Sequence, residues 1–230
     1  TTPSGSPCGM SHANNGTSDL NAWVGIFKEF LELMGHKANT GELFNKLYTN
    51  SLSGDKDCGG LLAYGYYSGE NVTMINEGRL AFLRTPDSKF NLANFMKVNL
   101  YTSLGAVKLG LDILLKYEGV KLDRIMGHGG FFKTKEVGQR YLSAAVGAPV
   151  TVMDTASEGG AWGIALLAAY LADKKEDEKL EDYLDKRIFA RLYGVSIEAT
   201  KEDIEGFDKF MERYVAGLEV EKAAIEAMKW

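Results

Sequence analysis

The hydrophobic pattern of the chain predicts four helices. Apolar residues recur every three or four positions within residues 20–34, 40–52 and 92–117. A fourth amphipathic stretch covers residues 202–228, with a break expected near Gly217. These stretches are long enough to bury one face each, so they are the expected framework of the core.

Short apolar runs between the helices predict strands. Four of them stand out, at residues 61–66, 79–83, 124–126 and 149–153. Residues 1–17 are expected to form a strand or extended entry that ends in a turn, followed by capping side chains at residues 17–19. Strands that alternate with helices indicate an α/β protein.

The stretch from residue 123 to 169 has a repeated order of strand, glycine turn and helix. The first turn is Gly127-His128-Gly129-Gly130 and the second is Ser157-Glu158-Gly159-Gly160. Glycines between a strand and a helix let a flat or anionic ligand approach the backbone, and the two turns are expected to line one crevice. The structural alternative is that glycine is needed there only for its backbone angles.

Three further features concern packing and exposure. Small residues in the helix expected over residues 92–117, among them Gly105 and Gly110, would let that helix lie close to a sheet. The apolar run from Ala161 to Leu171 is expected to be a buried helix. The charge run over residues 174–179 is expected to be solvated.

Composition is that of an ordinary globular domain, with 45% hydrophobic and 25% charged residues among 230. The net charge is −5 and basic residues do not cluster, which disfavours nucleic-acid and acidic-membrane binding. Apolar runs stay below the length of about 18 residues that spans a membrane, so no membrane partner is expected. Without a secretion signal at its polar start, the chain is expected to be cytoplasmic, with Cys8 and Cys58 as reduced thiols.

Several kinds of chemistry lack their motifs. The three histidines, His12, His36 and His128, do not have metal-ligand spacing, and no metal site is predicted. The phosphate-loop pattern GxxxxGK[ST] and the nucleophile pattern GxSxG are missing. A dinucleotide fingerprint fits poorly, because its third glycine would fall at Phe132.

Residues 123–169 resemble the C-terminal domain of the FGGY carbohydrate kinases. The resemblance rests on the Gly129-Gly130 turn with Gln139 in register, on Gly147-Ala148-Pro149-Val150, and on the helix that begins Glu158-Gly159-Gly160-Ala161. Upstream, Leu61-Leu62-Ala63-Tyr64 followed by Ser68-Gly69-Glu70 is similar to another family segment. The likeness covers about residues 9–172.

The resemblance implies an actin-like ATPase domain of the RNase H-like type, with a mixed sheet flanked by helices. Residues 1–230 would be the C-terminal half of a two-domain sugar kinase, with a core over about 9–172 and a helical tail over about 175–230. The N-terminal sugar-binding domain would be absent from this chain.

The resemblance also implies a nucleotide site for ATP or ADP. Matching the family motif residue by residue gives Gly129, Gly130, Phe131, Lys133 and Thr134 as the nucleotide-binding residues. Phe131 departs from the small residue usual at its position, and His128 matches no family role. No catalytic residue is assigned, because the family's aspartate base lies in the N-terminal domain, and Mg²⁺ is expected with the nucleotide only in the full-length enzyme.

Two functions from different classes remain open at this point. The first is the nucleotide-binding portion of a kinase for a pentulose, with xylulose favoured and ribulose next; the fragment itself would be inactive, and its sugar would be held mainly by the missing domain. The second is a non-catalytic actin-like module that uses its cleft for a partner. A homodimer is a further expectation, because a face made for a missing domain would be exposed.

Overall fold

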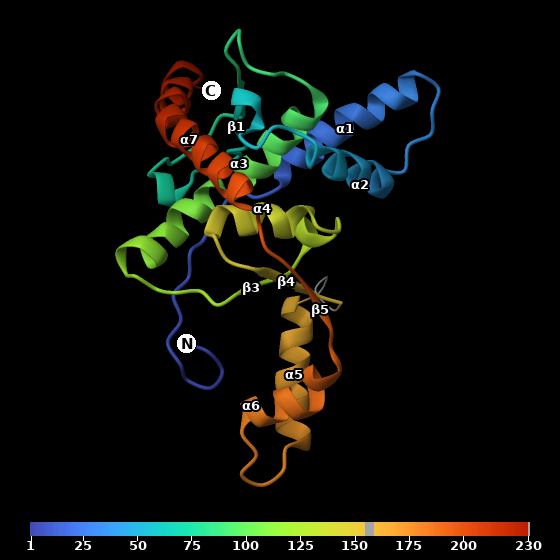
Figure 1. Ribbon diagram of the computed structural model, residues 1–230, viewed down its shortest axis with the longest axis vertical. Coiled ribbons are helices and arrows are strands. Elements are labelled where there is room, and N and C mark those ends of the chain that lie inside the picture. Colours follow the sequence, from blue (N-terminus) through green and yellow to red (C-terminus); the bar gives the residue numbers. More distant parts are fainter. Residues whose placement is uncertain (155–158, 230) are drawn as a thin grey trace.

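The computed structural model describes residues 1–154 and 159–229 (Figure 1). The four predicted helices form close to their expected bounds, and further helices occur along the chain. The helices are α1 (Ser18–Leu33), α2 (Thr40–Ser51), α3 (Leu92–Asp112), α4 (Val137–Val146), α5 (Gly159–Asp173), α6 (Leu180–Tyr183) and α7 (Lys201–Ala227). A π-helical turn, Ile113–Tyr117, extends α3 as far as the sequence pattern predicted.

The strands form two small sheets. They are β1 (Leu62–Tyr64), β2 (Ala81–Leu83), β3 (Ile125–Gly127), β4 (Val150–Met153) and β5 (Gly194–Ile197). β1 pairs with β2 in antiparallel fashion, while the second sheet has the order β3-β4-β5, with β3 parallel and β5 antiparallel to β4. The predicted mixed sheet is therefore present, but β5 was not predicted.

Helix α3 is the centre of the core. It crosses the middle of the molecule, with α7 on one side, α4 beneath it and α1 and α2 near its first turns (Figure 1). Phe95 of α3 packs edge-on against Trp23, and Tyr101 packs against Tyr141 and Phe207 from α4 and α7. Burial of such aromatic side chains is the main source of stability in a domain of this size.

By length and mean hydropathy the helix Leu92–Tyr117 could cross a membrane, but 61% of its apolar window is buried inside the domain. It also carries Asn94, Lys97 and Asn99, whose side chains are buried and hydrogen-bonded. Buried polar groups with protein partners are typical of the core helix of a folded domain.

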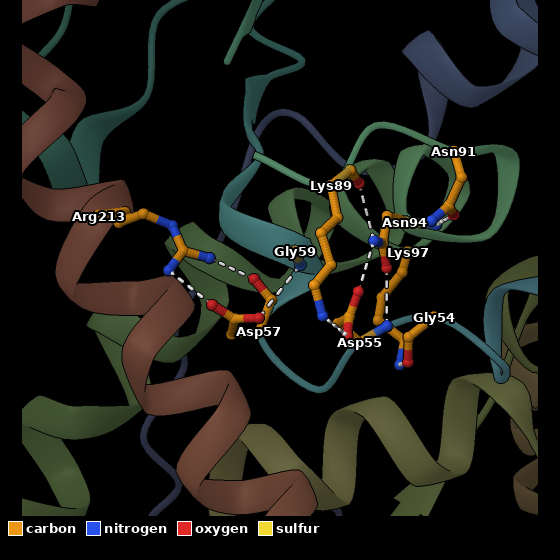
Figure 2. A network of polar contacts seen from close by, with 9 residues as sticks. All are labelled: Gly54, Asp55, Asp57, Gly59, Lys89, Asn91, Asn94, Lys97 and Arg213. Atoms are coloured by element: carbon orange, nitrogen blue, oxygen red, sulfur yellow. Dashed lines mark hydrogen bonds and ion pairs between the residues drawn. The ribbon is translucent and has the colours of Figure 1, made fainter. Parts of the chain in front are cut away.

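The loop between α2 and β1, residues 53–60, is held by side chains of α3 (Figure 2). Asn94 accepts a hydrogen bond from the backbone N–H of Asp55 at 2.7 Å and donates to its carboxylate at 2.8 Å. Lys97 donates to the carbonyl oxygen of Gly54 at 2.7 Å. These bonds fix where α2 ends, which matters for the site described below.

Of the two alternatives expected for residues 1–17, a strand or an extended entry, the structure forms no strand in this described part of the chain. It corrects the expectation of side-chain capping at the start of α1. Thr17 precedes α1 without a side-chain capping bond, and the carboxylate of Asp19 accepts from the indole N–H of Trp23 instead. The hydrophobic pattern predicted α1 correctly, but the carboxylate of Asp19 at its start bonds to the side chain of Trp23 and not to the helix backbone.

Helix α3 lies close to β1, as expected, but Gly105 itself faces Tyr214 of α7. Two other packing expectations were wrong. Gly217 does not break α7, because it lets that helix approach Leu62 and Tyr64 closely. None of the described side chains of α5 is buried, since α5 extends away from the body together with α6 (Figure 1).

Candidate functional site

The first glycine turn connects β3 to α4 through a short 3₁₀ turn, Gly130–Phe132. Two of its glycines have structural reasons. A Cβ atom on Gly127 would lie 2.8 Å from the ring of Phe132, so this glycine permits close packing. Gly129 has φ of 94°, a conformation that side-chain-bearing residues rarely adopt.

Gly130 has neither reason. Its φ is not positive, and a Cβ atom built on it would meet no other described atom within 4 Å. A glycine that the local backbone and packing do not require leaves its backbone face open to a ligand. The structural alternative therefore accounts for Gly127 and Gly129 but not for Gly130.

Gly130 borders a hollow of about 380 Å³. Its other walls come from the start of α1 and from α2, segments more than 80 positions upstream of the turn in sequence. The lining residues are Thr17, Asn21, Gly41, Phe44, Asn45, Tyr48, Gly130, Phe131, Lys133 and Thr134. The volume lies at the lower end of the range of about 300–1,000 Å³ that is typical of ligand pockets.

The structure thus brings four of the five predicted nucleotide-binding residues to one place: Gly130, Phe131, Lys133 and Thr134. Gly129 does not line the hollow and instead sets the geometry of the turn. The tight packing of the turn on α4, where a Cβ atom on Gly138 would lie 2.5 Å from the carbonyl oxygen of Phe131, fixes the turn to that helix.

The walls combine aromatic surface with a few polar groups. Phe44 and Tyr48 meet edge to face, with ring centroids 5.6 Å apart. Burial raises the pKa of Tyr48 to about 12, so its phenol stays protonated and neutral at physiological pH. Asn21 and Asn45 contribute amides that can both donate and accept, which suits the edge of a heterocyclic base.

Sequence reasoning missed the residues from α1 and α2. Asn21, Asn45 and Tyr48 lie within helices whose periodicity explained them without reference to a ligand. Thr17 was interpreted as a helix cap, but it also lines the hollow. No local signal could identify these positions, because only the folding of α1 and α2 beside the turn brings them to the site.

Gly159 and Gly160, the described residues of the second glycine turn, do not line this hollow. A Cβ atom on Gly159 would lie 2.8 Å from Nδ1 of His128, so the start of α5 touches the first turn. Trp162 of α5 and His128 line a separate hollow of about 720 Å³ beside the three-stranded sheet. Ser157 and Glu158 lie outside the described residues, and the single crevice expected from the sequence is not formed by those that are described.

Gln139, the residue in register with the family pattern, supports the sheet. Its Nε2 donates to the carbonyl oxygens of Val150 at 2.9 Å and Val195 at 2.7 Å, in β4 and β5. It thereby ties α4, which follows the glycine turn, to two strands. Within residues 1–154 and 159–229, no group of three or more His, Cys, Asp or Glu side chains is arranged to hold a metal ion.

Comparison with known proteins identifies relatives of the domain. Residues 1–172 match the C-terminal domain of the FGGY family of carbohydrate kinases. No curated protein matches the chain. The mixed sheet and the helices of the described residues agree with the actin-like fold of this family.

Solved structures of sugar kinases share the fold at low identity. A xylulose kinase from Rhodospirillum rubrum has a TM-score of 0.62 and 14% identity, covering 90% of this chain and 38% of its own. A gluconate kinase from Lactobacillus acidophilus has a TM-score of 0.62 and 15% identity, covering 92% of this chain and 39% of its own. A glycerol kinase with ADP from Plasmodium falciparum has a TM-score of 0.53 and 14% identity, covering 83% of this chain and 37% of its own. The chain therefore spans less than two fifths of these proteins.

Proposed function

Because the chain belongs to the FGGY family of carbohydrate kinases, we propose that it is the nucleotide-binding C-terminal portion of an ATP-dependent enzyme that phosphorylates a pentulose. Xylulose is favoured as the acceptor and ribulose comes next. The similar structures include xylulose, gluconate and glycerol kinases, so support for a pentulose comes from the sequence resemblance alone.

One observation carries the proposal. Gly130 borders the hollow, and neither its backbone conformation nor its packing requires a glycine at this position. A purine can lie on a glycine backbone because no side chain intervenes. The hollow offers aromatic surface from Phe44 and Phe131 and polar groups from Asn45 and Thr134, a combination that fits a base and its ribose.

The residues of this chain position the nucleotide, while ATP supplies the phosphoryl group when it is bound. Gly130 admits the base to the backbone, and Phe131 shields it from water. Lys133 is exposed at the rim, where its charge favours the approach of an anionic ligand. The catalytic base and the ligands of Mg²⁺ are proposed to lie in an N-terminal domain, so the chain alone should not turn over.

Calorimetric titration of the chain with ADP tests the proposal. The wild type is expected to bind, and Gly130→Trp is expected to lower the affinity at least about tenfold because an indole would fill the hollow. Gly163→Trp is the matched control, since a Cβ atom on that helical glycine also meets no described atom within 4 Å and the residue does not line the hollow. Absence of ADP binding, or equal binding by wild type and Gly130→Trp, would contradict a nucleotide site here.

The alternative is a non-catalytic actin-like module that uses the same cleft for a protein partner. The gene sequence upstream of residue 1 discriminates the two, because a kinase requires a domain with phosphate-contacting and aspartate motifs. A coupled ADP-release assay with xylulose gives a second check: turnover by the chain alone would contradict the assignment of catalysis to another domain. Cytoplasmic location, the sugar contact through the missing domain and homodimer formation remain predictions.

A further inference from the structure

We infer that Tyr141, Ser51 and Lys97 form a buried clamp that sets the separation of the two walls of the nucleotide hollow. This inference rests on the proposed function, since it assigns positioning residues to that site. The three residues come from three helices, α4, α2 and α3, and none of them lines the hollow. Each is almost completely buried, at 2%, 0% and 2% exposure.

The hydroxyl of Ser51 lies 2.7 Å from the phenol of Tyr141. Ser51 donates its proton to the carbonyl oxygen of Tyr48 at 2.5 Å, so the phenol must be the donor to Ser51. The result is a chain of two hydrogen bonds that runs from α4 to the backbone of Tyr48. Tyr48 is a wall residue of the hollow, and the chain therefore ends at the site.

Lys97 links the same two helices from α3. Its ammonium group donates to the carbonyl oxygen of Gly54, just after the end of α2, and lies 5.7 Å from the centre of the Tyr141 ring (Figure 2 for the Gly54 bond). Burial lowers the pKa of Lys97. Burying a lysine ammonium group costs free energy unless hydrogen-bonding partners compensate it. Here the contacts of Lys97 join the C-terminal end of α2 to α4.

The clamp connects both walls because each wall belongs to one of the clamped helices. Tyr48, Phe44 and Asn45 are on α2, and the turn that contains Gly130 is fixed to α4 through the contact of Gly138 with Phe131. A hydrogen bond between the two helices therefore acts as a spacer behind the hollow. Its loss would let the walls shift without removing any group that touches the ligand.

A clamp predicts an effect on binding that a merely stabilising bond would not have. Tyr141→Phe removes one hydroxyl and should weaken ADP binding about two- to tenfold, the worth of one hydrogen bond. Tyr66→Phe is the matched control, because the phenol of Tyr66 makes an equally buried hydrogen bond, 2.6 Å from that of Tyr214, and neither residue lines the hollow. Both variants should melt at a lower temperature, but only Tyr141→Phe should lose affinity.

A double-mutant cycle makes the test specific. Ser51→Ala should weaken ADP binding at least as much as Tyr141→Phe, because it also removes the bond to the carbonyl oxygen of Tyr48. The double variant should lose no more than Ser51→Ala alone, because the bond that Tyr141→Phe removes is already broken. Ser51→Thr retains the hydroxyl and should restore affinity. If Tyr141→Phe does not fold, Ser51→Ala with its Ser51→Thr rescue tests the clamp without it.

The outcomes separate the clamp from the nucleotide site itself. If the wild type does not bind ADP, the proposed function fails and the clamp with it. If the wild type binds ADP while Tyr141→Phe and Ser51→Ala bind as tightly as Tyr66→Phe, the nucleotide site stands and the clamp is refuted. Additive losses in the double variant would equally overturn it.

Discussion

The ring of Tyr214 lies directly against Gly105, where a Cβ atom would stand only 2.5 Å from the Cζ atom of the tyrosine. This contact joins α7 to α3 at the centre of the core. The phenol of Tyr214 is hydrogen-bonded to that of Tyr66 at 2.6 Å, which adds the segment after β1. The closing helix therefore belongs to the same core as the helices that precede it, although the family match ends at residue 172.

Gly105→Ala is expected to destabilise the domain. The added methyl group would collide with a fully buried ring, and overpacking of this kind costs about 1–3 kcal/mol. Urea unfolding monitored by circular dichroism measures the loss. Gly25→Ala in α1 is the control, because a Cβ atom there meets no described atom within 4 Å; it should leave stability equal or raise it by up to about 1 kcal/mol. Equal stability of the two variants would show that the ring of Tyr214 can move aside without an energetic cost.

Gln139→Glu is expected to weaken the attachment of the sheet to α4. A carboxylate cannot donate to the carbonyl oxygens of Val150 and Val195, and leaving such groups unpaired costs about 1–3 kcal/mol. Faster exchange of the backbone amides in β4 and β5 reports this directly: their protection should fall more than that of α3. Unchanged protection would mean that the strands do not depend on Gln139.

Asn45→Ala is expected to weaken ADP binding about two- to tenfold if the amide contacts the nucleotide. Asn50→Ala is the matched control, since both residues are exposed on α2 and only Asn45 lines the hollow. The same substitution in the same helix has the same intrinsic effect on helix stability. Titration calorimetry should therefore separate the two variants, and equal affinities would remove Asn45 from the site.

The buried carboxyl group of Glu221 is expected to make the domain less stable as pH rises. Its side chain is completely buried, one carboxylate oxygen accepts from the backbone N–H of Arg79 and the other has no partner among the described residues. Burial raises the pKa of Glu221 above its ordinary value of 4.5, against a smaller opposing effect of Arg79. Above pH 4.5 the unfolded chain releases this proton first, so the free energy of unfolding falls as pH rises.

Urea unfolding at several pH values tests this sign. Glu221→Gln carries no titrating group, and its stability relative to wild type should increase from pH 4.5 towards pH 8. Glu29→Gln, on the exposed surface of α1, makes the same substitution without burial and is the control. Parallel pH profiles for wild type and Glu221→Gln would contradict the assignment.

The elements that the sequence predicted well are those with a local signature. α1, α2 and α7 each bury one face, and that requirement leaves a periodic pattern in the residues themselves. α3 is buried on nearly all sides, and its length and apolar content identify it as a core helix. β5 has no such signature, because Gly194–Ile197 is a short, largely exposed strand that exists only by pairing with β4. The apolar run of α5 misled for the opposite reason: hydrophobic composition does not determine what a helix finds to pack against.

The sequence by itself determined the positions of the main helices, the strand–glycine–helix order around Gly129 and Gly130, and the resemblance to a kinase domain. The tertiary structure decided which glycine does what, since Gly127, Gly129 and Gly130 are alike in sequence and differ only in φ and in their neighbours. It also decided the walls of the hollow. Backbone propensity acts over a few residues, whereas the approach of α2 to the turn depends on contacts such as that between Ser51 and Tyr141, 90 positions apart, which no local pattern encodes.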